Sequence, residues 1–134
     1  MTCETDFCIM QHGTWRGVEI GIGECKSEKG RITRDDVENL VAVRENLAAK
    51  EFRCYIIFAK TADEFEPEEI EYFRGLKERK IPYILLLNKE LEPRRPYDRY
   101  TDAQLPRKHA LSLEDMARNS ARIYTPDEEE EAGG

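Results

Sequence analysis

No apolar run in this sequence approaches the roughly 20 residues that a membrane-spanning helix needs. The first ten residues, MTCETDFCIM, also lack the basic start and apolar middle of a signal peptide. We therefore expect no membrane partner and a cytoplasmic location. A chain of 134 residues is long enough for one domain with a single modest core.

Cysteine is scarce, and its spacing argues against a common kind of metal site. Cys3, Cys8, Cys25 and Cys54 include no CxxC pair, so a zinc site is not expected. In a cytoplasm these cysteines stay reduced. The last three fall in apolar stretches of strand length, where a thiol usually packs as a small hydrophobic side chain.

Phosphate-binding glycine loops are also missing. Neither GxGxxG nor GxxxxGK occurs, so a nucleotide-binding α/β domain ranks low among the candidate functions. Gly17, Gly21 and Gly23 fall instead within an expected strand, where glycine relieves packing or lets another backbone approach closely.

Acidic residues dominate the net charge of −7, but they are unevenly distributed. The run DEEEE at 127–131 opens an acidic tail, 127–134, that we expect to be disordered. Residues 1–126 are then the folded domain. Within it, residues 93–126 carry seven basic and four acidic side chains, a balance that permits nucleic-acid binding.

Hydrophobic periodicity predicts the order strand, strand, helix, strand, helix, strand, loop, helix. The expected strands cover residues 3–10, 17–26, 54–59 and 83–88, and the expected helices run from Thr33 to about Lys50, from Pro67, and over about 112–123. Two of the strands are wholly apolar and are joined by a helix, which is typical of a parallel βαβ unit. The predicted fold class is α/β, with a mixed central sheet flanked by helices.

Three local signals mark the helix starts. Thr33 is a good N-cap, and Asp36 at the third helical position makes an aspartate variant of the capping box. Pro67 opens the second helix at its first turn, and Ser112 caps the third.

Two charged residues end the apolar face of the strand VEIGIGECK, residues 18–26. Because strand side chains alternate, Glu24 and Lys26 share one face and Cys25 points to the other. A hairpin with its turn in QHGTWRG, residues 11–17, folds Asp6 back toward Glu24. Two carboxylates and the backbone carbonyl of Cys25 make an oxygen-rich site suited to Mg²⁺ or Mn²⁺. Lys26 can position an attacking water or stabilise charge on a phosphate.

A simpler interpretation is a surface ion pair at the end of a strand. The same pattern recurs at Glu78-Arg79-Lys80, on the polar end of a helix, where it is a solvated face. Glu24-Cys25-Lys26 differs because it follows an apolar strand, where charges are costly to place.

Asp6, followed on the next strand by Glu24-Cys25-Lys26 and then by a helix and a strand, resembles the PD-(D/E)xK nuclease superfamily, the restriction-endonuclease-like fold. The similarity covers about residues 3–60. It implies that Asp6 and Glu24 bind a divalent metal ion while Lys26 assists the hydrolytic water. The implied activity is endonuclease or exonuclease cleavage of phosphodiester bonds, in DNA rather than RNA.

The sequence departs from the family pattern in two ways. Thr5 stands where the first motif has proline, and only five residues precede Asp6, so the helix and strand that begin the family core are missing. Either the chain is part of a larger protein, or it is an inactive nuclease-like α/β module that binds nucleic acid or a protein partner. The resemblance also implies a possible homodimer, since many such nucleases cut duplexes as dimers.

Basic residues near the motif and in a later loop are candidate nucleic-acid contacts. Lys29 and Arg31 follow Ser27 in the loop after the motif. In the segment 92–109, arginines alternate with tyrosines that can stack on bases; the candidates there are Arg94, Arg95 and Arg99. Ordinary solvent-exposed loops explain both clusters about as well.

Four further residues are secondary candidates. Glu19 is expected on the face opposite Glu24, toward solvent or a neighbouring strand. Gln11 and His12 are expected in an exposed turn. Arg44 interrupts the apolar face of the first helix; we expect its head to reach water, with the catalytic rim as the alternative.

Overall fold

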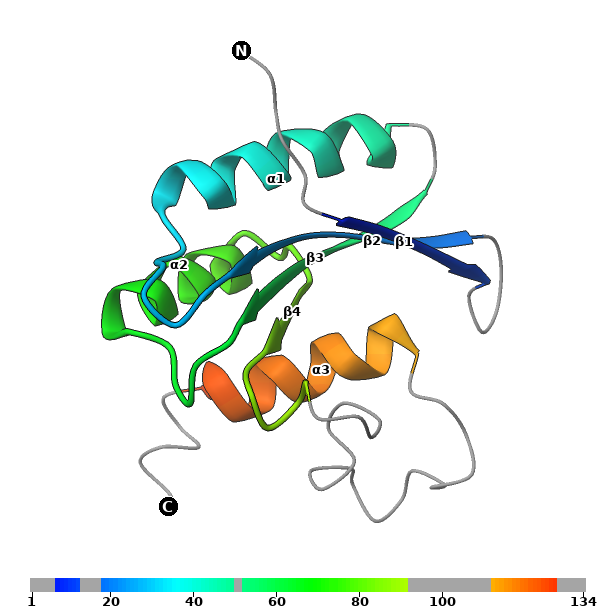
Figure 1. Ribbon diagram of the computed structural model, residues 1–134. Helices are drawn as coiled ribbons and strands as arrows, with labels where there is room; N and C mark the ends of the chain where they lie inside the picture. Colours follow the sequence, from blue (N-terminus) through cyan, green and yellow to red (C-terminus); the bar gives the residue numbers. More distant parts are fainter. Residues whose placement is uncertain (1–6, 13–17, 50–51, 92–111, 128–134) are drawn as a thin grey trace.

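The computed structural model describes residues 7–12, 18–49, 52–91 and 112–127 (Figure 1). In these ranges the fold is mixed α/β, in the order that the sequence predicts. The elements are β1 (Phe7–His12), β2 (Val18–Lys26), α1 (Arg34–Ala48), β3 (Arg53–Lys60), α2 (Pro67–Glu78), β4 (Tyr83–Leu86) and α3 (Leu113–Tyr124).

The described strands form one sheet in the order β1-β2-β3-β4. β1 pairs antiparallel with β2, which confirms the hairpin, whereas β2, β3 and β4 are mutually parallel. Figure 1 shows α1 and α2 on one face of the sheet and α3 on the other. The β2-α1-β3 and β3-α2-β4 crossovers both progress in the same direction across the sheet. Two right-handed crossovers that progress in the same direction place their helices on the same face.

The core has two layers, one on each face of the sheet. Ile56 and Phe58 of β3 lie in the larger layer, under α1 and α2, with Phe73 of α2 fully buried against them. Tyr55 and Ile57 of the same strand lie in the smaller layer, under α3. Covering on both faces explains why this strand reads as a continuous apolar run rather than an alternating one.

Local capping signals fix where the helices begin. The Thr33 hydroxyl accepts the Asp36 backbone N–H at 3.2 Å, and Asp36 accepts the Thr33 backbone N–H at 2.9 Å. The predicted capping box is therefore confirmed. Pro67 is the first residue of α2, and Ser112 caps α3 by accepting the Asp115 backbone N–H. The first helix ends at Ala48, two residues before the predicted end.

Two predicted boundaries are wrong. Gln11 and His12 belong to β1, where they pair with Glu19 and Val18, and not to a turn. The ladder continues through these polar residues because backbone pairing on a strand does not depend on an apolar side chain. The last strand ends at Leu86, since the chain turns there and the Asn88 N–H donates to the Ala62 carbonyl.

Several expectations concern residues outside the described ranges. They are the start of the first strand at 3–6, the centre of the hairpin turn at 13–17, and the acidic tail beyond Asp127. None of the helices in the described ranges is both long enough and apolar enough to cross a bilayer.

Two glycines predict opposite responses to a larger side chain. A Cβ on Gly21 would lie 2.7 Å from Ile57 Cδ1 and 3.6 Å from Leu113 Cδ1, whereas a Cβ on Gly75 meets nothing within 4 Å. We expect Gly21→Val to lower the free energy of unfolding by about 1–3 kcal/mol through overpacking. Gly75→Ala should raise it by about 0.5–1 kcal/mol through helix propensity. Urea denaturation measures both, and equal effects of the two substitutions would contradict this packing.

Candidate functional site

Glu24 and Lys26 lie together at the carboxyl end of β2. Lys26 Nζ is 3.2 Å from Glu24 Oε1, and the two side chains are 26% and 14% exposed, respectively. Their shared face, predicted from the alternation of strand side chains, is the face covered by α1, since Ile20 and Ile22 of the same parity pack in that layer. The charges therefore sit at the rim of the sheet and within reach of water.

Asp36 is the second partner of the Lys26 ammonium, at 3.3 Å from Oδ2. The sequence predicted this aspartate only as a helix cap. Because α1 starts soon after β2 and covers its face, the first turn of the helix lies over the end of the strand. That spacing is the signal that could have revealed the contact.

The two carboxylates keep Lys26 positively charged. Partial burial lowers the pKa of Lys26, but the hydrogen bond to Glu24 and the negative charge of Asp36 outweigh it, so the pKa stands above its ordinary value of 10.5. At neutral pH this side chain is thus an ammonium that can donate hydrogen bonds and stabilise negative charge.

The backbone carbonyl of Cys25 points toward the β1 side of β2. The Lys26 carbonyl accepts the Thr61 N–H at 3.0 Å, on the β3 side of the strand. Successive carbonyls of a strand point in opposite directions, so the Cys25 carbonyl points to the β1 side.

The two cysteines with described side chains differ in environment. The Cys25 thiol is exposed, which corrects the expectation that it packs in the core; the residue lies at the carboxyl end of β2, at the rim of the sheet. Cys54 is buried, as expected.

Four predicted site residues lie outside the described ranges, namely Asp6, Arg94, Arg95 and Arg99. The residues next to Asp6 and Glu24, Phe7 and Gly23, pair directly across the hairpin. Lys29 and Arg31 are exposed in the loop between β2 and α1, as predicted, but the sequence did not anticipate how this loop is fixed.

A buried ion pair, which the sequence did not reveal, lies beside the site. Lys60, at the end of β3, is aligned with Lys26 in the parallel register. Its Nζ is 2.8 Å from Glu69 Oε1, and the side chains are only 3% and 1% exposed. Neither residue was singled out from the sequence. One feature of the sequence could have indicated this lysine: Lys60 directly follows the apolar run at 54–59, just as Lys26 ends the apolar face of β2.

Glu69 joins three parts of the molecule. Its Oε2 accepts the Ile32 backbone N–H at 2.8 Å, and its Oε1 accepts the Glu66 backbone N–H at 2.7 Å as well as the Lys60 ammonium. One carboxylate therefore ties the end of β3 and the start of α2 to the loop that precedes α1.

The secondary candidates lie away from the rim. Glu19 is on the opposite face, as predicted, and it is only 1% exposed, so of its two expected environments, solvent and a neighbouring strand, solvent is wrong. Arg44 Nε donates to the Cys54 carbonyl at 3.1 Å. This bond lies at the start of β3, the end remote from Glu24, because α1 runs back along the sheet. The arginine therefore binds a strand carbonyl and does not reach the rim where Glu24 and Lys26 lie.

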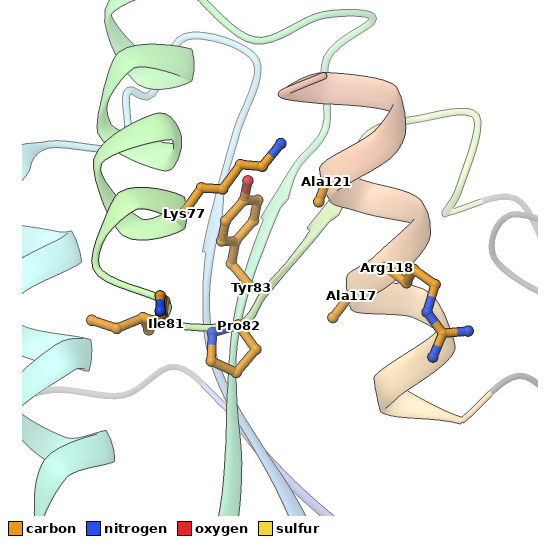
Figure 2. Close-up of a pocket in the computed structure, with 8 residues that line it drawn as sticks. Lys77, Ile81, Pro82, Tyr83, Ala117, Arg118 and Ala121 are labelled. Atoms are coloured by element: carbon orange, nitrogen blue, oxygen red, sulfur yellow. The ribbon is translucent and has the colours of Figure 1, made fainter. Parts of the chain in front are cut away.

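An open hollow of about 270 Å³ lies between the end of α2, the start of β4 and α3. Figure 2 shows the Tyr83 ring between the two helices, with Ala117 and Ala121 pointing toward it from α3. Tyr83 opens β4 whereas Lys26 closes β2, and these strands run parallel, so the hollow is at the opposite end of the sheet from the charged rim.

Neither a family model nor a curated protein nor a solved structure matches this chain.

The buried pair predicts a large and specific loss of stability. Glu69→Gln leaves the Lys60 ammonium buried without its counter-charge, so we expect the free energy of unfolding to fall by about 3–5 kcal/mol. Lys60→Met in the same chain should recover part of that loss. The control is Glu38→Gln, which breaks a 2.7 Å ion pair with Arg79 whose side chains are 52% and 44% exposed; it should cost no more than about 1 kcal/mol. Urea denaturation giving equal losses for the two single variants would contradict this ranking.

Tyr83 predicts a loss of stability in alkali. Burial raises the pKa of its phenol above the ordinary value of 10, against the opposing effects of the Thr125 hydrogen bond and the positive charge of Lys77. The neutral phenol therefore stabilises the fold fully below pH 10, and this contribution is lost as pH rises through the raised pKa. Tyr83→Phe should make the free energy of unfolding fall less steeply above pH 10. An unchanged slope in urea denaturation at several pH values would contradict this.

Proposed function

We propose that this chain is a metal-dependent nuclease with a restriction-endonuclease-like core, related to the PD-(D/E)xK superfamily, that hydrolyses phosphodiester bonds in DNA rather than RNA. The observation that carries the proposal is the placement of Glu24 and Lys26, paired at 3.2 Å on one face at the carboxyl end of β2. A hairpin, then a helix, then a parallel strand surround them in the order that the resemblance implies.

The hairpin register supports Asp6 as the second carboxylate. If the register that pairs Phe7 with Gly23 ran on by one residue, position 6 would be opposite Glu24. Directly opposed residues of an antiparallel pair present their side chains on the same face. Asp6, Glu24 and the Cys25 carbonyl on the β1 side would then offer the hard oxygen donors that Mg²⁺ or Mn²⁺ prefers.

Within the described residues, no three histidine, cysteine or acidic side chains gather as a metal site. The proposed donor set does not need such a group there, because one carboxylate comes from Asp6 and one oxygen from the backbone. A bound ion would polarise the phosphodiester and lower the pKa of the attacking water. Lys26, held as an ammonium, would donate to that water or stabilise charge developing on the phosphate.

The surrounding positive charge would bind the substrate backbone. Lys29 and Arg31 are exposed beside the rim, where phosphates could reach them. Arg94, Arg95 and Arg99 complete the proposed contact set. Assembly as a homodimer or within a larger protein, and action in the cytoplasm, belong to the same proposal.

A second candidate function is a non-catalytic module that binds nucleic acid or a protein. The observation in its favour is that Lys26 Nζ lies within 3.3 Å of both Glu24 and Asp36, as in an ion pair that only stabilises a strand end. Cleavage assays separate the two functions.

We expect Mn²⁺-dependent cleavage, abolished by EDTA, when the full chain is incubated with single- and double-stranded DNA and RNA. Lys26→Met should lower the rate by about 100-fold or more, because it removes a charge that stabilises the transition state. The control, Lys80→Met, alters the same residue type in Glu78-Arg79-Lys80, which is exposed at the end of α2. Wild-type protein that cleaves none of the four substrates, or equal rates for the two variants, would overturn the nuclease proposal.

A further inference from the structure

One ammonium is shared between two carboxylates at the rim. Lys26 Nζ lies 3.2 Å from Glu24 Oε1 and 3.3 Å from Asp36 Oδ2. In the proposed nuclease Glu24 is also a metal ligand. A divalent cation and an ammonium then compete for the same carboxylate, and their like charges repel each other.

Asp36 is held independently of Glu24. Its Oδ2 accepts the Thr33 backbone N–H at 2.9 Å within the capping box, and the helix N-terminus favours its negative charge. The neighbouring Ile32 N–H is bound by the buried Glu69 carboxylate. The position of Asp36 is therefore set by backbone contacts on both sides of the cap and does not depend on a metal ion.

The stem of Lys26 is also confined. A Cβ on Gly30 would lie 3.3 Å from Lys26 Cβ and 3.5 Å from its Cδ, so the loop backbone packs against the aliphatic part of the side chain. The adjacent cation, Lys60, is neutralised by Glu69. Lys26 is thus guided along its stem by the loop and at its head by two carboxylates.

We propose that Asp36 is a positioning residue for Lys26. When Glu24 binds the metal ion, Asp36 keeps the Lys26 ammonium at the rim. This role rests on the proposed nuclease function. Asp36 touches neither metal nor substrate in this role; it acts through the ammonium. The structure shows the shared state, in which both carboxylates bind Lys26.

The first test needs neither metal nor cleavage. Glu24→Gln imitates a carboxylate whose charge is neutralised, and Asp36→Asn removes the other charge while keeping an oxygen for the Thr33 N–H. Asp35→Asn is the control, since it removes the same charge from the same first turn of α1, at an exposed side chain that is not one of the ion-pair partners of Lys26 among the described residues. The probe is the ¹H–¹⁵N signal of the Lys26 ammonium, which is visible only while contacts slow proton exchange with water, with the buried Lys60 as internal reference.

The Lys26 signal should persist in Glu24→Gln and in Glu24→Gln/Asp35→Asn, and disappear in Glu24→Gln/Asp36→Asn. Its loss in Glu24→Gln alone, or its survival in Glu24→Gln/Asp36→Asn, would overturn the role of Asp36. The Lys60 signal should stay in every variant and shows that the fold is intact.

Steady-state kinetics at saturating Mn²⁺ provide the second test. Asp36→Asn should lower kcat by about 10-fold or more with KM changed less than about twofold, since a displaced catalytic group costs rate rather than binding. Asp35→Asn should leave both unchanged, and Asp36→Asn should add no further loss in the Lys26→Met background. Equal kcat for the two aspartate variants would overturn the inference while the nuclease function stands. Absence of cleavage by the wild type would overturn the nuclease function, while the ammonium signals still decide the ion pair.

Discussion

The Lys60–Glu69 ion pair is the interaction on which the charged rim depends. Removing both charges from water is costly, and the cost is offset because the Glu69 carboxylate accepts the ammonium and two backbone N–H groups. The contacts join the end of β3, the start of α2 and the loop before α1. Loss of either partner would leave an uncompensated charge in a region that is almost fully buried.

The geometry at the rim follows from that anchor through short links. The Glu69 carboxylate accepts the Ile32 backbone N–H, and the next residue, Thr33, caps α1. The capping box of Thr33 fixes Asp36, which forms an ion pair with Lys26. Each link outside the core is an ordinary hydrogen bond or a partly exposed ion pair, worth little alone. Together they hold Lys26 in one position. A lysine that is confined at its aliphatic stem and at its ammonium is already placed when a substrate arrives.

Local signals in the sequence predicted much of this fold. The period of two along β2 placed Glu24 and Lys26 on one face, and the cap residues Thr33 and Ser112 marked helix starts within a residue. Long-range contacts could not be predicted in this way. The pairing of Lys60 with Glu69, and of Lys26 with Asp36, depends on how helices lie over strands, and the alternation of strand side chains gives the face of Glu19 but not its burial. The nuclease assignment itself remains a proposal from the motif and its placement.

The most direct test of the central proposal is to locate the metal ion on the full chain. Mn²⁺ broadens the backbone amide NMR signals of residues near it, so a titration followed residue by residue identifies where the ion binds. We predict broadening centred on Gly23 to Lys26 at the carboxyl end of β2, and its loss in Glu24→Gln. Broadening confined to the acidic run at 127–131, or unchanged in Glu24→Gln, would contradict a metal site at this rim.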